Sequence, residues 1–255
     1  MKKKTLLKLF TAIIMVLAIA GLTSCGSSED ETLIAVTEPT FPPFDTTNED
    51  GELTGFDMDL LNAIAEDQGF KVEYEQREFD ALIPSVESDQ ADIIAAGMNA
   101  EDPARQKKVD FSDTYYDSGL VILVKEGDTN INGADDFTSD MKIGAQIGTT
   151  SADKAKEFQK EGKIGKAVIL DKNSDAILQL KNGDIQAIII DKPVAETYMK
   201  EQPGVVKAVG DVMNAESYGF AVKKGNDDLK EKINKGLKNV KDNGTYDELV
   251  EKWFK

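Results

Sequence analysis

The sequence predicts an α/β protein with two mostly parallel sheets, each flanked by helices. Apolar segments of strand length alternate with amphipathic segments of helix length up to residue 95, and the alternation starts again after residue 124. This alternation favours parallel strands joined by crossover helices. With 255 residues, the chain can form one large domain or two small ones.

The composition excludes several classes of function. With a formal net charge of -17, the chain lacks the basic surface that nucleic-acid phosphates need, so we expect no nucleic acid as a partner. Charge repulsion favours a monomer. The chain has no histidine and a single cysteine, which excludes histidine-based triads, histidine zinc sites, internal disulfides and thiolate clusters. We expect neither a metal nor a cofactor.

Residues 1–24 have the features of a secretory signal peptide. A lysine-rich start precedes an apolar stretch over 6–22. A membrane anchor helix is the alternative, since the stretch is at the lower end of transmembrane length. The run 22–25, Leu-Thr-Ser-Cys, resembles the lipobox, which implies cleavage before Cys25 and a lipid on this residue that holds the protein to the membrane. Residues 25–31 then form a flexible tether.

The first part of the chain has five predicted elements. Apolar residues recur on one face of the segment 55–67, as in an amphipathic helix, and alternate with charged residues over 70–75, as in a half-buried strand. Three prolines stiffen the loop 38–44, and Pro84 is expected to bend its helix. The predicted elements are strand 32–37, helix 55–67, strand 70–75, helix 79–88 and strand 91–95.

The second part repeats this pattern. The continuous apolar runs 119–124 and 187–190 suit buried strands. Pro193 marks a helix start, and Gly244 separates two amphipathic helices at the end of the chain. The remaining predicted elements are strand 142–147, helix 150–160, strand 167–170, helix 175–181, helix 193–200, strand 218–222 and helices 227–241 and 246–254.

The segment 96–112 contains the central candidate for ligand binding. Gly97 has no Cβ, which allows a ligand to approach the backbone. Pro103 is expected in the first turn of a short helix. Arg105 would then lie just beyond a strand end, where open α/β sheets bind ligands, and its planar fork matches a carboxylate. The alternative, favoured by this segment alone, is an arginine on a solvated turn held by an acidic neighbour.

Two further segments have both a structural and a functional interpretation. The run 148–151, Gly-Thr-Thr-Ser, stands between a predicted strand and helix, where free N–H groups and hydroxyls either bind an anion or cap the helix. Asp191 ends a buried strand before the helix that begins at Pro193. Its carboxylate either faces a crevice or caps that helix. The residues alone leave both alternatives open.

Together these segments resemble the amino-acid-binding proteins of ABC importers, extracellular solute-binding protein family 3. The residues that carry the likeness are Gly97-Met98, Arg105, the Val-Asp-Phe-Ser run at 109–112, Tyr115-Tyr116 and the segments 55–60, 79–84 and 244–247. The chain departs from the family in one extra residue between Met98 and Arg105. It also has Asn99 where Thr or Ser is commoner.

The resemblance implies a two-lobed periplasmic-binding-protein-like fold of type II. Each lobe would be a mostly parallel sheet flanked by helices, and two hinge strands would join the lobes. The implied boundaries are 32–116 and 218–255 for lobe 1, 121–212 for lobe 2, and 117–120 and 213–217 for the hinge.

The resemblance also implies that Arg105 clamps the α-carboxylate of an amino acid. Thr150 and Ser151 would hold the same carboxylate from the second lobe, and Asp191 would hold the α-ammonium. The predicted ligand-binding residues are Glu38, Phe41, Asp57, Phe79, Gly97, Met98, Asn99, Arg105, Gln146, Thr149, Thr150, Ser151 and Asp191.

The side chain of the ligand is implied to lie among two aromatic and two acidic residues. Phe41 and Phe79 match the aromatic walls of the family, with plain core packing as the alternative for each. Glu38 and Asp57 match positions that face the far end of the ligand, which suggests a cationic side chain such as that of lysine, arginine or ornithine. An acid at position 38 also occurs in relatives that bind neutral amides.

The function implied by the resemblance is binding without catalysis. A lipid-anchored protein on the outer side of the cell membrane would capture a free amino acid and deliver it to the permease of an ABC transporter. One alternative is an enzyme on the same fold, similar to cyclohexadienyl dehydratase, which would have to use carboxylates, lysine or tyrosine as its acid or base. Another is a sensor module that reports the ligand to a signalling partner.

Overall fold

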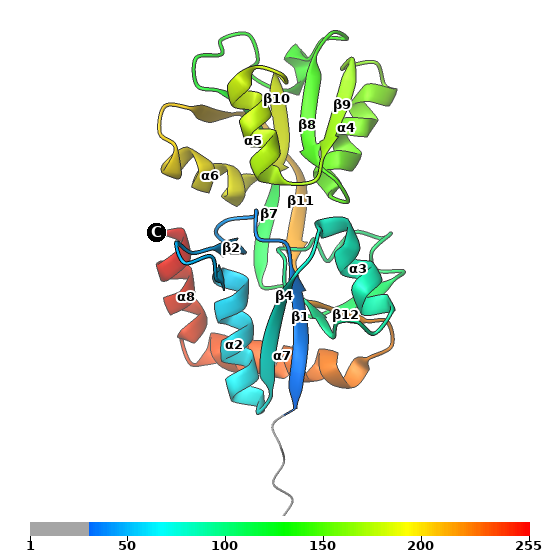
Figure 1. Ribbon diagram of the computed structural model, residues 1–255, viewed down its shortest axis with the longest axis vertical. Helices are drawn as coiled ribbons and strands as arrows, with labels where there is room; N and C mark the ends of the chain where they lie inside the picture. The colour runs from blue at the N-terminus through cyan, green and yellow to red at the C-terminus, as the bar shows by residue number, and fades with distance from the viewer. Residues whose placement is uncertain (1–30) are drawn as a thin grey trace, which may run out of the picture. The chain divides into compact units, whose positions relative to one another are not determined.

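Two five-stranded sheets form the frame of the protein (Figure 1). The structure is a computed structural model that describes residues 31–255. Thr32 to Lys255 form one compact unit. The predicted signal peptide, the lipid attachment site Cys25 and nearly all of the tether lie outside the described residues. Within 31–255, no helix is long and apolar enough to cross a membrane.

The first sheet has the strand order β4-β1-β5-β12-β6. Its strands are β1 (Thr32–Thr37), β4 (Lys71–Gln76), β5 (Ile93–Ile94), β6 (Val109–Phe111) and β12 (Ala221–Lys223). β1 runs parallel to β4 and β5, whereas β12 runs antiparallel to β5 and β6. Parallel neighbours need crossover connections, which α2 (Phe56–Gln68) and α3 (Phe79–Glu87) supply. A small hairpin of β2 (Thr46–Thr47) and β3 (Leu53–Thr54) precedes α2.

Helices cover both faces of this sheet because successive side chains of its strands point to opposite faces and are apolar on both. Ala35 and Ile93 pack in one cluster with α2 and α7 (Asp227–Asp242), whereas Val36 and Ile94 pack in another with α3. In Figure 1, α2 and α8 (Thr245–Phe254) lie on the opposite side of the strands from α3, and α7 crosses behind the strands. We call this sheet with its helices lobe 1.

The second sheet has the strand order β11-β7-β10-β8-β9. Its strands are β7 (Tyr116–Lys125), β8 (Lys142–Gln146), β9 (Lys166–Leu170), β10 (Ala187–Asp191) and β11 (Val206–Tyr218). β8, β9 and β10 are parallel, whereas β7 is antiparallel to β10 and β11. The helix α4 (Thr150–Lys160) packs on one face, and α5 (Asn173–Asn182) and α6 (Lys192–Glu201) pack on the other. We call this sheet with its helices, including the short 3-10 helix η1 (Ala134–Asp136), lobe 2.

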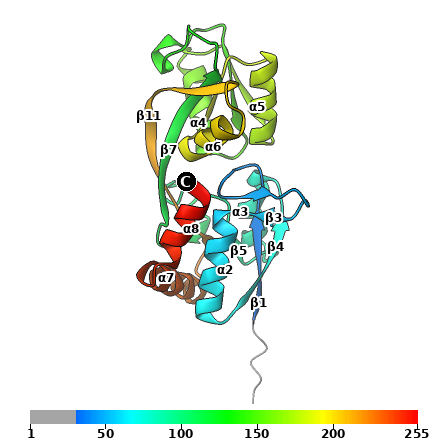
Figure 2. The same ribbon diagram turned by 90° about the vertical axis from the view of Figure 1, so that its left-hand side faces the viewer.

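The long strands β7 and β11 form a ribbon that runs between the lobes (Figure 2). They pair antiparallel, and their register shifts on either side of Met213. A Cβ at Gly119 would lie 2.4 Å from Cγ1 of Val212, so the close approach of the two strands requires a glycine there. Strand pairs with register shifts of this kind bend locally.

The predicted α/β fold with two lobes is confirmed, and β1 and α4 have the predicted bounds. The short helix expected at Pro103 is wrong, because residues 101–108 form turns. One carboxylate oxygen of Asp102 accepts the backbone N–H groups of Ala104 and Arg105, each at 2.8 Å. This side chain closes the turn, and the chain then enters β6 at Val109.

The sequence analysis missed most of β11: within Val206–Tyr218 it expected only the hinge strand 213–217 and the first residue of the strand 218–222. Its residues are mostly exposed or half-buried, so the period of two that marks a half-buried strand is weak before residue 216. The predicted strand 218–222 is wrong at its start, since Tyr218 ends β11 and β12 begins at Ala221. β6 was also missed, because three residues are too few to show a pattern. Pairing with distant strands defines all three elements.

Candidate ligand-binding site

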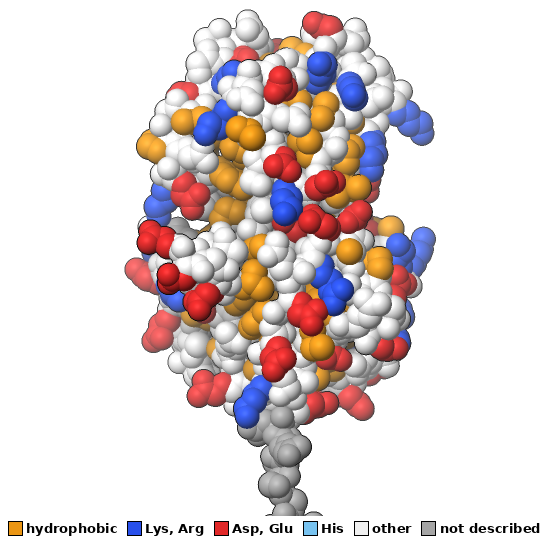
Figure 3. Space-filling view, in the orientation of Figure 1, with side chains coloured by type: hydrophobic (Ala, Val, Ile, Leu, Met, Phe, Trp, Pro, Cys, Tyr) orange, Lys and Arg blue, Asp and Glu red, His pale blue; other side chains and the backbone are white. Residues whose placement is uncertain are grey.

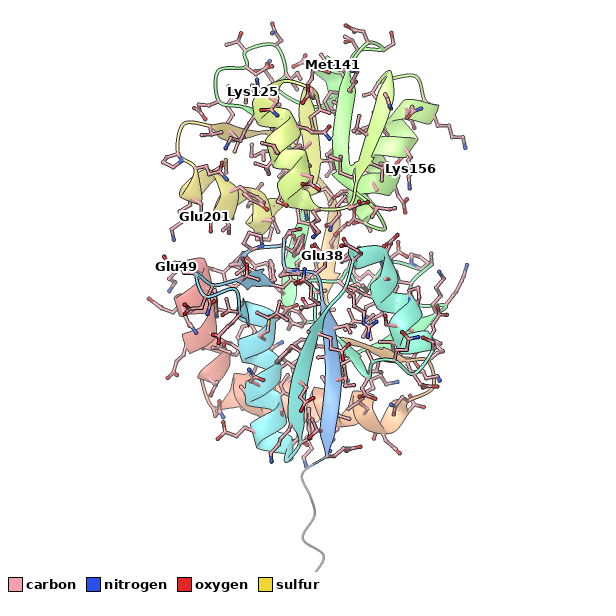
Figure 4. The ribbon with its side chains drawn as sticks, viewed as in Figure 1. Glu38, Glu49, Lys125, Met141, Lys156 and Glu201 are labelled. Atoms are coloured by element: carbon pink, nitrogen blue, oxygen red, sulfur yellow. The ribbon has the colours of Figure 1, made fainter. Side chains whose placement is uncertain are left out.

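The predicted site residues gather where the carboxyl ends of the strands in each lobe face the other lobe. Glu38 follows β1, while Gln146 and Asp191 are the last residues of β8 and β10. Figure 4 shows Glu38 at the end of lobe 1 that faces lobe 2. Open α/β sheets bind their ligands outside the carboxyl ends of the strands, so the two lobes turn their binding edges toward one another.

A pocket of about 280 Å³ opens beside Arg105. Phe79, Met98 and Arg105 line it from lobe 1, and Gly148, just before α4, lines it from lobe 2. A Cβ at Gly148 would lie 3.1 Å from the Cβ of Asp80, at the start of α3. Groups from both lobes therefore meet at this pocket.

Arg105 is buried, with 8% of its surface exposed. Its guanidinium donates to the backbone oxygen of Gly148 at 3.1 Å and to that of Asn99 at 3.4 Å, and it lies 5.5 Å from the centre of the Phe79 ring. Burial lowers the pKa of Arg105, and nearby acids, first Asp102, raise it. In the described part of the chain no carboxylate forms an ion pair with it. Arg105 is therefore a buried cation at the pocket and not an arginine on a solvated turn.

The residues at the start of α4 have roles within the fold itself. The hydroxyl of Thr149 accepts the N–H of Ala152 at 3.1 Å and donates to the backbone oxygen of Gln146 at 2.6 Å. Thr149 is therefore the helix cap, which is the structural alternative for this residue. The next residue, Thr150, lies close enough to Glu216 in β11 to lower the pKa of its carboxyl. Ser151 is buried in the first turn of α4.

Asp191 lies near a second buried acid, Glu216, and the two carboxyls interact electrostatically. It also accepts a hydrogen bond from the hydroxyl of Tyr218. Burial raises the pKa of both carboxyls, and repulsion between them raises that of Asp191 further, while Arg105 lowers both. The side chain of Asp191 makes no cap bond to α6, so the helix-cap alternative is wrong for this residue.

Glu216 and Tyr218 were not predicted as site residues. The segment around Glu216 was interpreted only as a hinge strand, and Tyr218 as the start of a different strand. They are two residues apart, and residues two apart in a strand point to the same face. This spacing was the only signal that could have placed them together.

Glu38 joins the edges of the two lobes. One of its oxygens accepts from the amide of Gln146 and from the hydroxyl of Thr40, each at 2.8 Å, and the other has no partner within residues 31–255. Gln146 also donates to the backbone oxygen of Asp171 and accepts from the amide of Asn173. Burial raises the pKa of Glu38. A buried carboxylate with one oxygen unpaired is a strong acceptor for a cationic group.

Asp57 supports the site from inside lobe 1. One of its oxygens accepts the N–H of Gly97 and the hydroxyl of Tyr115, each at 2.7 Å. Burial raises the pKa of Asp57 to about 7. A second buried acid, Asp45, was not predicted. Its pKa is well above the usual range because of burial and of repulsion by Asp57, although the hydroxyl of Thr37 bonds to it.

Gly97 is required for a reason that differs from the predicted approach of a ligand. Its φ is +51°, and a Cβ there would lie 2.4 Å from Cε1 of Phe41. The ring of Phe41 occupies this space and lies 6.0 Å from the ring of Tyr218. Phe41 is thus packed between Gly97 and the ribbon formed by β7 and β11, with 8% of its surface exposed.

Met98 and Asn99 shape the backbone beside Arg105. Met98 is buried, and its backbone oxygen accepts the N–H of Gly219 at 3.2 Å. The side-chain oxygen of Asn99 accepts the N–H of Glu101 at 3.0 Å, which closes a turn. Within 31–255, no three His, Cys, Asp or Glu side chains are placed to hold a metal ion.

The chain belongs to a known class of solute-binding proteins. Residues 33–255 match the family described as bacterial extracellular solute-binding proteins, family 3. The family predicted from the sequence is therefore confirmed. Its members with similar sequences and structures are named as binding proteins for particular amino acids.

Two relatives are named for different amino acids. The arginine-binding extracellular protein ArtP of Bacillus subtilis (strain 168) is 34% identical over 259 residues, which cover 99% of this chain and 98% of that protein. The L-cystine-binding protein TcyJ of Escherichia coli (strain K12) is 31% identical over 228 residues, which cover 89% of this chain and 84% of that protein.

Two solved structures of amino-acid-binding proteins are also similar to this chain in sequence and fold. An ancestral arginine-binding protein bound to arginine has a TM-score of 0.83 and 44% identity, and the match covers 88% of this chain and 98% of that one. The ancestral amino acid-binding protein AncCDT-1, described as a precursor of cyclohexadienyl dehydratase, has a TM-score of 0.81 and 39% identity, covering 88% and 96%.

Proposed function

We propose that this protein captures a polar amino acid, preferably a cationic one, between its lobes and delivers it to the permease of an ABC transporter. The observation that carries the proposal is Arg105, a buried cation without a carboxylate partner in the described chain. An unpaired buried charge is costly. A ligand carboxylate would supply the missing partner with two parallel hydrogen bonds.

The α-ammonium, which is on the same carbon as the carboxylate, would meet an acid. Asp191 would hold the α-ammonium, because its carboxylate lies near enough to Arg105 for the two charges to interact. Thr150 and Ser151, in the first turn of α4, would add donors to the ligand carboxylate at the positive end of that helix.

A cationic side chain is supported by the acids elsewhere in the site. Glu38 has a buried oxygen without a partner in the described chain, and Phe41 and Phe79 can lie against a cation. The relatives named as arginine-binding proteins support the same preference. Because another relative is named as a cystine-binding protein, other polar amino acids are also candidate ligands.

Ligand capture would close the lobes. A ligand that touches Arg105 and Asp191 contacts both lobes, and it stabilises the closed form more than the open one. Hinge closure of periplasmic binding proteins is a general example of this transition. We propose the hinge at 117–120 and 213–217, with lobe 1 at 32–116 and 218–255 and lobe 2 at 121–212. The irregular pairing of β7 and β11 supports this placement.

The remaining parts of the proposal concern the environment of the protein. Cys25 would carry the lipid that anchors it to the outer side of the cell membrane, and the protein would act as a monomer. Figure 3 shows acidic side chains on both lobes, with basic ones scattered among them and no broad basic patch on that face. This distribution supports the expectation that nucleic acid is no partner.

A second candidate is catalysis on the same fold. It is favoured by the likeness to AncCDT-1 and by two buried acids with raised pKa values, Asp191 and Glu216, which could donate a proton. Incubation with prephenate and arogenate tests it directly. Formation of an aromatic product would replace binding with catalysis as the main function.

A thermal-shift screen tests the binding proposal. The protein without its predicted signal peptide would be screened against the common amino acids, ornithine, citrulline and cystine. A ligand that binds only the folded state stabilises it by about 4 kcal/mol at a thousandfold excess over its Kd. We expect the largest shift with arginine, lysine or ornithine. A shift with glutamine or cystine alone would remove the cationic preference, and no shift with any compound would contradict the proposal.

A further inference from the structure

Two residues of each lobe form a closed ring of hydrogen bonds, which we call the latch. Its members are Glu38 and Thr40 in lobe 1, and Gln146 and Asn173 in lobe 2. One oxygen of Glu38 accepts from the amide of Gln146 and from the hydroxyl of Thr40, each at 2.8 Å. The amide of Asn173 donates to the side-chain oxygen of Gln146 at 2.8 Å, and its backbone N–H donates to the hydroxyl oxygen of Thr40 at 3.2 Å. Two of these bonds join the lobes.

The latch includes the start of α5. The first N–H groups of a helix have no partner within the helix, and a side chain at the N-cap commonly supplies one. Lys172 stands at the N-cap of α5, and its side chain makes no cap bond. Asn173 is the first residue of the helix, and the hydroxyl of Thr40 accepts its N–H. A hydroxyl of lobe 1 therefore takes the place of a cap for a helix of lobe 2.

The latch is buried, and a third bond between the lobes lies beside it. Glu38 and Gln146 have 1% of their surface exposed, and Asn173 has 3%. The hydroxyl of Tyr198 in α6 donates to the backbone oxygen of Thr40 at 3.3 Å. Separation of the lobes at this place would break all three bonds, and water would have to replace the lost partners.

We propose that Thr40 and Asn173 are positioning residues for ligand capture: through the latch they hold the lobes together without touching the ligand, and so slow the release of a bound amino acid. Every bond of the latch joins two atoms of the protein, so the latch forms in the free protein as well as in the complex. The effect on release rests on the proposed function, whereas the closure of the free protein does not.

The variant Thr40→Val tests the latch with little change in the size of the side chain. It removes two bonds, the one to Glu38 and the one from Asn173. Two hydrogen bonds of ordinary net strength correspond to about thirtyfold in the equilibrium between the closed and the open form. Thr40→Ser keeps the hydroxyl, so it is the matched control and should restore the behaviour of the wild type.

Small-angle X-ray scattering measures closure of the free protein without its predicted signal peptide. Separation of the lobes increases the radius of gyration, so we expect a larger radius for Thr40→Val than for the wild type and Thr40→Ser, which should agree. The same radius for all three proteins would overturn the inference. This comparison needs no ligand, so it decides on the latch even if the wild type binds no amino acid and the proposed function fails.

Stopped-flow fluorescence measures the release of L-arginine. The single tryptophan, Trp253, lines a pocket together with Pro193 of lobe 2, so its emission reports the contact between the lobes. We expect release about thirtyfold faster from Thr40→Val than from Thr40→Ser. Equal release rates in these two variants would contradict the inference.

Tyr198→Phe separates the latch from a second explanation, a loosened Glu38. This variant removes only the neighbouring bond to the backbone of Thr40, and release should be about fivefold faster than from the wild type. Faster release from Thr40→Val with wild-type release from Tyr198→Phe would assign the effect to Glu38 and overturn the inference. If Thr40→Val does not fold, Tyr198→Phe is the deciding variant in both measurements.

Discussion

Two pairs of buried acids, Asp45 with Asp57 and Asp191 with Glu216, are stabilised in different ways. Asp57 is held by donors of the lobe 1 frame, the N–H of Gly97 and the hydroxyl of Tyr115. Asp191 accepts a hydrogen bond from Tyr218, and both Asp191 and Glu216 interact electrostatically with Arg105. Acids bonded to the frame stabilise the shape of lobe 1, whereas acids near Arg105 lie where a ligand would bind. Substitutions should therefore separate folding from binding.

The largest expected effect is on binding at Arg105. Arg105→Ala should weaken amino-acid binding by about 3–5 kcal/mol, because the ligand carboxylate would be buried without its partner. The melting temperature should change little, since the described chain has no ion pair to lose there. Arg77→Ala, which removes an arginine paired with Glu75 near the surface, is the matched control. Calorimetric affinity close to that of the wild type would contradict the assigned site.

The second effect concerns folding and pH at Asp57. Its pKa is about 7 in the folded protein, above the unfolded value of about 3.9. The folded state therefore holds more protons between these values, and the contribution of Asp57 to stability falls as pH rises from about 4 to about 7, by at most about 4 kcal/mol.

Asp57→Asn should remove this contribution while its amide oxygen still accepts from Gly97 and Tyr115. Urea unfolding of both proteins at several pH values measures it. The free energy of unfolding of the variant, relative to the wild type, should increase with pH up to about 7 and then level off. Parallel pH curves for the two proteins would show that the carboxyl titrates normally.

A smaller loss of stability is expected for Gly97→Ala. The positive φ and the contact with the Phe41 ring should together cost about 1–3 kcal/mol. Gly162→Ala separates the two causes, because Gly162 has a φ of +74° with open space around its Cβ position. Urea unfolding should show the larger loss for Gly97→Ala. Equal losses would mean that Phe41 moves aside at no cost.

The smallest effects are expected at the neighbouring hydroxyls of Thr149 and Thr150, at the start of α4. Thr149→Ala removes the helix cap and should cost about 0.5–2 kcal/mol of stability, with the affinity unchanged. Thr150→Ala removes the hydroxyl near Glu216 instead and should weaken binding more than it weakens the fold. Melting curves and calorimetry on both variants distinguish the two roles, and the reverse pattern would assign Thr149 to the ligand.

The sequence by itself determined the elements whose pattern is local. The run 149–160 contains both the cap and the apolar face of the helix, and the structure begins and ends α4 at the predicted residues 150 and 160. The strand 32–37 is equally well defined by its own composition. The family likewise followed from short segments, among them Gly97-Met98 and Arg105.

Only the tertiary structure decided the features that depend on distant partners. β11 is a strand because β7 pairs with it, and the three residues of β6 form a strand because β12 pairs with them. The same holds for the site: local sequence cannot show that Tyr218 donates to Asp191, because this bond joins β11 to the end of β10 in lobe 2. Local pattern specifies elements, whereas burial and pairing between them decide which charges share a site.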